Sequence, residues 1–560
     1  MRKSIFAFAM GLSTLAFPQN AKAEVDPNFY IYLCFGQSNM EGNAKAESMD
    51  QTVDKRFRLL ATCNYDNPKR TMGQWYDAKP PLVNSMAGGL GPTDYFGRTM
   101  VAALPSNVRI GVVPVAMGGS PIEMFDKDKY AQKLAQNPND WWATIAKTCY
   151  GGNPYGRLIE MAKKAQEVGV IKGILLHQGC SNNGDPNWPN MVKKIYNDML
   201  TDLGLSADSV PLFVGETLRQ ENGGSCYGHN VQVNRMPSVV PTSHVISSED
   251  LPGNGQDSWH FSALGYRIFG KRYAFAALEL MGKELYADTA YVMPNAYKKF
   301  YLAKSIDVPT SMSAMPGQSI PVKATFNDNH KENVSQFLIC NSNDLVFENG
   351  ALSPKHEGTG TAEITYRDFL RNEKTATTQL DVKFFPLKEE SLTLFKGTAS
   401  FNNTDSTFSV KSSSQIGWRY DAGADMSDYG YIIIKLKEPI LKSSCAIRIY
   451  AQNDVSSSNY YNKAIGKNDT LVVINLNNMV RNNKKISPTH ISIISLYSTA
   501  VSTIKIDNIY LSQEDPTGIE TILSNNPKKE VTYDLQGRKV SSHNLRGGIY
   551  IRDGKKVLIK

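Results

Sequence analysis

A serine in a sharp turn near the start of the chain is the first residue that could do covalent chemistry. Ser38 is the third residue of the stretch Gly-Gln-Ser-Asn-Met at 36–40, which follows the apolar run 29–35. Such a run is typical of a buried strand, and the glycine indicates a turn at its end. A serine that leaves a sheet edge in this way can reach both a base and a carbonyl carbon. The competing interpretation is a serine that only caps the following helix.

The residues that would activate Ser38 come much later, in the stretch Asp-Ser-Trp-His at 257–260. In a turn before a helix, Asp257 and His260 are spaced so that they can face each other. The carboxylate then holds one imidazole N–H while the other nitrogen faces a hydroxyl. The other histidines of this half of the chain lack such a neighbour, and we interpret them as structural. The set predicts Ser38 as nucleophile, His260 as general base and Asp257 as the group that orients the base.

The elements that must position these residues form an α/β pattern. From residue 28 to about 281, short β-rich runs alternate with helical stretches, which is typical of a fold with a parallel sheet. The expected strands are 29–35, 108–116, 171–176, 210–214 and 244–247. Ligands of open parallel sheets bind beyond the carboxyl ends of the strands.

Polar or glycine-rich stretches follow the first three expected strands. They begin with Ser38, with the pair Gly118 and Gly119, and with Gln178. At one sheet edge, backbone N–H groups and the Gln178 amide could together form an oxyanion hole. The alternatives are a tight turn for the glycine pair and a hydrogen-bonded loop for the glutamine.

Taken together and in this order, the motifs resemble the conserved blocks of the SGNH/GDSL hydrolase superfamily. Within it they are similar to the acetylesterases of carbohydrate esterase family 6 and the sialate O-acetylesterases, over about residues 28–285. The resemblance implies a three-layer α/β/α fold and acyl transfer without a metal or an organic cofactor. It implies an oxyanion hole made by the backbone N–H groups of Ser38 and Gly119 and the side chain of Gln178.

Two residues depart from the pattern of that family. Cys180 stands where the family usually has Glu after His-Gln-Gly, and Asn182 replaces a frequent acidic residue. We therefore expect different hydrogen bonds in the loop that carries Gln178.

Composition and charge narrow the class of protein. The chain is 41% hydrophobic and 20% charged, as in ordinary globular domains, and its net charge of +8 is spread over 560 residues. No basic stripe interleaved with aromatic residues is present, so we expect no nucleic-acid partner. The substrate is expected to be an acetylated sugar or polysaccharide.

The seven cysteines are irregularly spaced and form no Cys/His cluster with metal-ligand spacing, so no structural zinc is expected. Cys34 lies in the first expected strand, where it fits a small buried hydrophobe. Four others could pair outside the cytoplasm, in an order that the sequence does not give; they are Cys63, Cys149, Cys180 and Cys226.

Both ends of the chain carry features of an exported protein. Residues 1–23 have two basic residues, an apolar run at 5–17 and a small-x-small site at 21–23, which together predict a signal peptide. No later run is long enough to span a membrane. Residues 525–560 resemble the C-terminal sorting segments of Bacteroidetes type IX secretion, and their plainer interpretation is a hairpin-rich tail. We expect a secreted, cell-surface or periplasmic protein of a Gram-negative, Bacteroidetes-like bacterium.

The expected domains are an SGNH-type esterase domain at 24–290, a small immunoglobulin-like β-sandwich at 305–386, a jelly-roll, carbohydrate-binding-like domain at 387–515 and the sorting segment at 525–560. Aromatic side chains of the jelly-roll region could either face a sugar or pack its core. They are Trp418, Tyr420, Tyr429, Tyr460 and Tyr461. Trp141 and Trp142, in the loop 126–155, could likewise either face a sugar or pack in the core.

The function expected from these features is a secreted carbohydrate O-acetylesterase acting on plant polysaccharide, with acetylxylan as the first substrate. A sialate O-acetylesterase is the alternative, and the catalytic residues do not separate the two. An alternative of another class is an inactive surface glycan-binding protein, for which Cys180 is the only hint. The complete set of Ser38, His260 and Asp257 argues against it.

Overall fold

The computed structural model contains two compact units. The first is residues 1–301 with 369–371, and the second is 302–368 with 372–560. The described residues are 25–83, 89–283, 285–316, 318–319, 322–340, 345–348, 351–354, 357–441, 444–516, 519–521, 532–533, 539–540, 547–552 and 555–559. The predicted signal peptide lies outside them, as does part of the predicted sorting segment.

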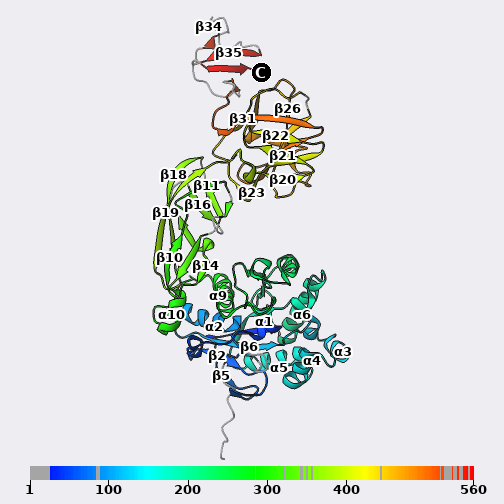
Figure 1. The fold of residues 1–560 in the computed structure, drawn as a ribbon, viewed down its shortest axis with the longest axis vertical. Coiled ribbons are helices and arrows are strands. Elements are labelled where there is room, and N and C mark those ends of the chain that lie inside the picture. Colours follow the sequence, from blue (N-terminus) through cyan, green and yellow to red (C-terminus); the bar gives the residue numbers. More distant parts are fainter. Residues whose placement is uncertain are drawn as a thin grey trace, which may run out of the picture. The chain divides into compact units, whose positions relative to one another are not determined.

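A seven-stranded sheet with the order β5-β2-β6-β1-β7-β8-β9 runs through the first unit (Figure 1). Neighbouring strands are parallel except β5, which pairs antiparallel with β2. The five strands predicted from the sequence are confirmed, whereas β2 and β5 were not predicted. The bounds are β1 Phe29–Gly36, β2 Phe57–Leu60, β5 Trp75–Asp77, β6 Arg109–Ala116, β7 Val170–His177, β8 Leu212–Gly215 and β9 Ser243–Ile246.

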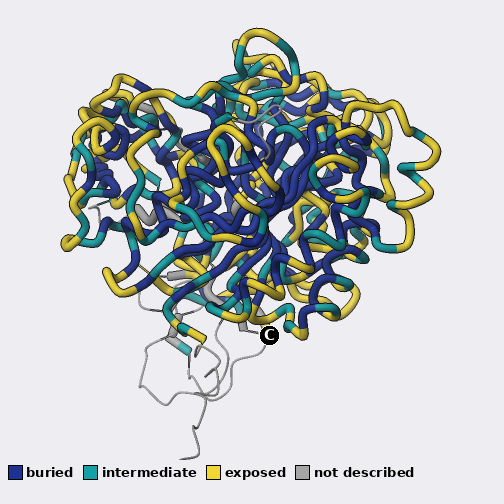
Figure 2. Tube along the Cα trace, turned by 90° about the horizontal axis from the view of Figure 1, so that it is seen from below, coloured by how far each residue is buried: buried dark blue, intermediate teal, exposed yellow. Residues whose placement is uncertain are grey.

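Helices cover both faces of this sheet. Ile31, Leu33 and Phe35 of β1 pack with α4, α5 and α6 in one core, whereas Tyr32 and Cys34 pack with α2 and α9 in a second core. The strands are buried over most of their length. Figure 2 colours the buried parts of the chain dark blue. The predicted three-layer α/β/α fold is therefore confirmed. The helices are α2 Pro92–Ala103, α4 Trp141–Tyr150, α5 Pro154–Gln166, α6 Trp188–Leu203 and α9 Ala263–Leu280.

Gly36 explains why β1 and β7 can end side by side. Its φ is +149°, and a Cβ at this position would lie 2.1 Å from the carbonyl oxygen of His177. The next residue, Gln37, donates its backbone N–H to the same carbonyl at 3.0 Å. Only glycine allows this approach, which sets where the chain leaves the sheet just before Ser38.

The second unit is built of antiparallel-rich sheets. Its first part has the sheets β10-β13-β14, β11-β19-β18-β15 and β12-β17-β16. The strands are β10 Ala303–Asp307, β11 Ser311–Ala314, β12 Gln318–Ser319, β13 Lys323–Phe326, β14 Lys331–Asn333, β15 Leu338–Cys340, β16 Leu345–Glu348, β17 Ala351–Pro354, β18 Gly358–Arg367 and β19 Glu373–Val382. The C-terminal segment contributes the sheet β32-β36-β35-β33-β34, with β32 Ile519–Thr521, β33 Thr532–Tyr533, β34 Lys539–Val540, β35 Gly548–Arg552 and β36 Lys555–Ile559.

Between these parts, two five-stranded sheets share one hydrophobic core. Trp418 and Tyr420 are buried in it, and their polar atoms donate to the carbonyls of Pro386 and Phe384. Neither ring can therefore face a sugar, which corrects the expectation that they might. The strands are β20 Thr393–Lys396, β23 Ser414–Ala424, β30 Ile491–Ser498, β25 Cys445–Tyr450 and β26 Tyr460–Ile465, and β21 Ala399–Asn402, β22 Thr407–Val410, β31 Ser502–Ser512, β24 Tyr431–Leu436 and β27 Leu471–Asn475. The domain boundaries expected in this half stay predictions.

Among the described residues, no helix is both long and apolar enough to cross a membrane.

Candidate active site

Ser38, His260 and Asp257 form one hydrogen-bonded chain. Ser38 is the first residue of the short helix α1 (Ser38–Glu41), directly beyond the end of β1. Its Oγ lies 2.8 Å from Nε2 of His260, although the two residues are 222 positions apart in sequence. Nδ1 of His260 lies 2.8 Å from Oδ2 of Asp257. The structure thus brings together the three residues that were predicted to be the nucleophile, the base and its orienting group.

The contacts of Asp257 fix the roles of the imidazole nitrogens. A carboxylate only accepts hydrogen bonds, so Nδ1 of His260 must donate, and Nε2 of the neutral ring can accept from the Ser38 hydroxyl. Burial disfavours the charged carboxylate, but hydrogen bonds from His260, Asn254 and the Trp259 N–H outweigh it. They hold the pKa of Asp257 well below its ordinary value. The carboxylate therefore stays ionised at neutral pH.

The backbone N–H groups of Ser38 and Gly119 are free to bind an anion. Ser38 and Gly119 both line the pocket described below, and neither N–H makes a hydrogen bond within the described part of the chain. Gly119 has a φ of +76°, which a side chain would strain. These donors fit the two backbone positions predicted for an oxyanion hole.

The third predicted donor, Gln178, is not brought into the pocket. Its side chain is fully buried, and its Nε2 donates to Ser120 O at 3.2 Å and to Asn182 Oδ1 at 2.8 Å. Its Oε1 accepts from Nε1 of Trp188, which can only donate, so the orientation of the amide is fixed. Because both amide hydrogens are used, Gln178 has the alternative role, a group that holds its loop.

The residues that depart from the family pattern take part in the same loop. Asn182 accepts from the N–H of Ile122 and donates to Glu123, so it joins this loop to the segment after β6. Gln37 accepts from the N–H of Gly179 at 3.1 Å. Neutral amides thus make the hydrogen bonds between these loops, and Asn182 is one of the two positions where the resembled family has an acidic residue.

Asn39 links the helix of the nucleophile to the loop of the base. Its Nδ2 donates to the Trp259 carbonyl at 3.0 Å, and its Oδ1 accepts from the Tyr266 hydroxyl at 2.6 Å. Asn39 is fully buried. Since Trp259 directly precedes His260, this side chain helps to set the distance from Ser38 to the imidazole.

Replacing Asn39 tests this positioning role. In Asn39→Ala the Trp259 carbonyl and the Tyr266 hydroxyl lose their partner, so the loop of His260 can shift. We expect kcat to fall about 10- to 100-fold with KM nearly unchanged, because a small misplacement of a reacting group is costly. Steady-state kinetics on a soluble acetyl ester measures both constants. An equal loss of activity and of folded protein, with kcat per folded molecule unchanged, would contradict the role.

A pocket of about 380 Å³ opens at Ser38 and His260. Its walls include two indole rings that remain half exposed, Trp141 at 52% and Trp259 at 48%. Trp142 lines it as well but is largely buried in the core. Of the tryptophan pair in the loop 126–155, Trp142 therefore packs in the core, whereas the ring of Trp141 is open to the pocket. The lining residues are Gln37, Ser38, Asn43, Gly118, Gly119, Trp141, Trp142, Cys180, Ser181, Trp259 and His260.

Sequence reasoning assigned no role to Asn39, Asn43 or Trp259. Asn39 and Trp259 stand inside the two stretches that carry Ser38 and His260, so their positions were the only available signal. No sequence signal pointed to Asn43 at the pocket.

Residues 28–279 match a protein-family model described as carbohydrate esterase, sialic acid-specific acetylesterase. The protein is an esterase. The match covers the sheet, its helices and the hydrogen-bonded chain from Ser38 to Asp257, and it stops before the second unit.

Solved structures show weak similarity to between 45% and 63% of the chain. A protein from Arabidopsis thaliana is 20% identical, with 45% of this chain and 99% of that chain covered and a TM-score of 0.36. NanS is 16% identical, with 46% and 99% covered and a TM-score of 0.35. A carbohydrate acetylesterase from Xanthomonas citri is 16% identical, with 63% and 79% covered and a TM-score of 0.32. At these scores the likeness says nothing about the substrate of this chain.

Proposed function

We propose that this esterase removes acetyl groups from plant polysaccharide, with acetylated xylan as its substrate, through a serine acyl-enzyme. The observation that carries the proposal is the chain of hydrogen bonds from Ser38 through His260 to Asp257. It ends in a pocket where the backbone N–H groups of Ser38 and Gly119 have no other partner among the described residues.

In the proposed mechanism, Ser38 Oγ attacks the acetyl carbonyl carbon while Nε2 of His260 takes the hydroxyl proton. The N–H groups of Ser38 and Gly119 stabilise the negative oxygen of the tetrahedral intermediate. His260 then protonates the departing sugar oxygen. A water molecule that loses its proton to His260 attacks the acetyl-serine, and acetate leaves as Ser38 regains its proton. Asp257 stays ionised and stabilises the imidazolium at each stage.

The lining of the pocket favours a neutral sugar over sialic acid. Sialic acid carries a carboxylate, which proteins usually bind with Arg or Lys. Neither residue type lines the pocket in the described part of the chain. The half-exposed rings of Trp141 and Trp259 instead offer apolar faces to a sugar ring. This supports the polysaccharide proposal over the sialate alternative.

Acetate release measured side by side on acetylated xylan and on O-acetylated sialic acid tests the substrate. We expect kcat/KM to be about tenfold or more higher on xylan-derived substrate, because an unpaired carboxylate in this pocket is costly. The Ser38→Ala protein supplies the blank for spontaneous deacetylation. A preference for the sialate substrate would overturn the assignment, and no release from either would favour the inactive glycan-binding alternative.

We also propose that the enzyme acts outside the cytoplasm, with residues 1–23 as the export signal and 525–560 as a sorting segment. A plant polymer is too large to enter a cell intact, so an enzyme that deacetylates it must be exported. The sequence features at both ends support this proposal.

A further inference from the structure

Two cysteines meet at the wall of the active-site pocket. Cys180 begins the short 3-10 helix η3 (Cys180–Asn182) after β7 and lines the pocket, whereas Cys226 directly precedes η5 (Tyr227–His229). Sγ of Cys226 lies 4.0 Å from the Cys180 carbonyl oxygen, and the two thiols are close enough for each to shift the pKa of the other. Both are thiols in the structure.

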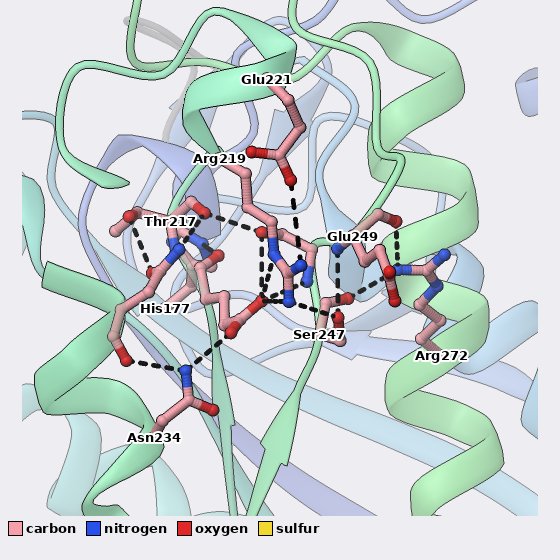
Figure 3. A network of polar contacts seen from close by, with 11 residues as sticks. His177, Thr217, Arg219, Glu221, Asn234, Ser247, Glu249 and Arg272 are labelled. Carbon is pink, nitrogen blue, oxygen red and sulfur yellow. Dashed lines mark hydrogen bonds and ion pairs between the residues drawn. The ribbon is translucent and has the colours of Figure 1, made fainter. Parts of the chain in front are cut away.

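Neighbouring hydrogen bonds hold the Cys226 segment in place. Oγ1 of Thr217 donates to the Cys226 carbonyl at 3.0 Å, and Thr217 belongs to the polar network beyond β8 that Figure 3 shows. Glu216 accepts hydrogen bonds from Arg219 at 2.8 Å, from Asn234 at 2.8 Å and from the N–H of Ser248 at 2.9 Å. On the other side, the N–H of Ser225 donates to the Ser258 carbonyl at 2.9 Å. These hydrogen bonds hold the Cys226 segment beside the loop of Cys180.

A second pair lies elsewhere in the same unit. The thiols of Cys63 and Cys149 are also close enough for each to shift the pKa of the other. Nη1 of Arg157 donates to the carbonyls of Thr62 and Cys149 at 2.8 and 2.9 Å, which ties the two backbone segments together.

The three remaining cysteines have no cysteine contact among the described residues. Cys34 is fully buried in β1, and burial raises its pKa to about 12, which makes it unreactive. Cys445 donates to Oγ of Ser498. Cys340 lies in the second unit.

We propose that Cys180–Cys226 and Cys63–Cys149 are disulfides in the mature protein and that the first one braces the active-site pocket. Each bond forms by exchange with an external disulfide such as oxidised glutathione. One thiolate attacks the external disulfide and expels one thiol, and the second cysteine then attacks the mixed disulfide and expels the other. Two protein thiols are oxidised and one external disulfide is reduced to two thiols.

The reactive thiol is identified by its environment. Contact with Cys180 lowers the pKa of Cys226, which raises the fraction of this thiol that is present as the reactive thiolate. The Cys63 thiol acts in the same way on Cys149, whose pKa is lowered to about 7.

The Cys180–Cys226 bond joins two walls of the site. Ser181, next to Cys180, donates its Oγ to the carbonyl of Gly119 at 2.8 Å, on the side of the proposed oxyanion hole. Ser225, next to Cys226, holds Ser258 in the loop of the proposed base. The bond would therefore fix the relative position of the two sides, in the loop where the family pattern has an acidic residue instead of Cys180.

Thiol counting and peptide mapping test the pairing without reference to activity. The full chain is incubated with oxidised glutathione, denatured, titrated for thiols and digested without reduction for mass spectrometry. With two disulfides formed, three of the seven cysteines remain as reactive thiols. We expect this thiol count together with the two crosslinked peptides. Seven reactive thiols, or Cys180 joined to any cysteine other than Cys226, would overturn the pairing.

Paired serine variants test the bracing role. In Cys180→Ser/Cys226→Ser we expect Tm to fall by about 5–10 °C and kcat on a soluble acetyl ester to fall about three- to tenfold. Activity of this variant should no longer respond to reductant. The matched control is Cys63→Ser/Cys149→Ser. Its Tm should also fall, but reductant should still lower its kcat as it does in the wild type. If reductant does not change kcat of the oxidised wild type, the bracing role is wrong even where the crosslink is found.

Discussion

Ser38→Ala should abolish acetate release while leaving the protein folded. The variant removes the hydroxyl of the proposed nucleophile, and it deletes one hydrogen bond to His260. We expect kcat to fall by about 10⁴- to 10⁶-fold. The residual activity would come from the backbone donors and from substrate binding. Release of acetate from a simple acetyl ester, followed for hours at high enzyme concentration, measures the loss.

Folding and specificity of the effect need their own controls. The Tm of Ser38→Ala should stay within about 2 °C of the wild type, because Ser38 is only half-buried and alanine is a good helix former at this position. Ser209→Ala is the matched control, since Ser209 is exposed and only donates to the carbonyl of Ser206. Wild-type rates in Ser38→Ala would contradict the nucleophile assignment, and a comparable loss in Ser209→Ala would show that the assay reports something else.

Most of the α/β half of the fold could be predicted because its strands carry recognisable β-rich runs. The residues of β1 are apolar on both faces, as expected for a parallel strand covered by helices on each side. The strand β2 has four residues and is interrupted by Arg58, and β5 has three and ends at Asp77, so neither gives a continuous apolar run. The strand β8, which is no longer than β2, does give one and was predicted. The place of β2 and β5 in the sheet follows from pairing with β6 and with each other, which no local pattern reveals.

The three residues that the structure joins by hydrogen bonds could be proposed from the sequence, but the groups that support them could not. Ser38, Asp257 and His260 stand in short motifs whose geometry is set locally. The role of Gln178 depended on which partner its amide meets, and that partner is Trp188, ten residues further along the chain. A buried amide takes the hydrogen bonds that its neighbours leave unsatisfied. Here Trp188 and Asn182 determine that Gln178 holds its loop instead of facing the substrate.

Asp257→Asn should reduce kcat almost as severely as loss of the nucleophile. Oδ1 of Asp257 accepts the backbone N–H groups of Trp259 and His260, so an asparagine will keep its oxygen there. Its NH₂ group then faces Nδ1 of His260 and Nδ2 of Asn254, where the carboxylate used to accept. The imidazole must carry its proton on Nε2 and can no longer take the proton of Ser38. We expect kcat to fall about 10³- to 10⁴-fold with KM little changed.

The same variant makes a pH-dependent prediction for stability. The carboxyl of Asp257 has a depressed pKa when folded and an ordinary one, near 3.9, when unfolded. Its contribution to stability is therefore present above about pH 4 and is lost as the pH falls toward the folded pKa. Urea midpoints of wild type and Asp257→Asn should differ most at pH 6 and converge toward pH 3. Asp208→Asn, at an exposed site, should keep a constant offset and full activity. A gap between wild type and Asp257→Asn that widens in acid would mean that the carboxylate is not stabilised by these hydrogen bonds.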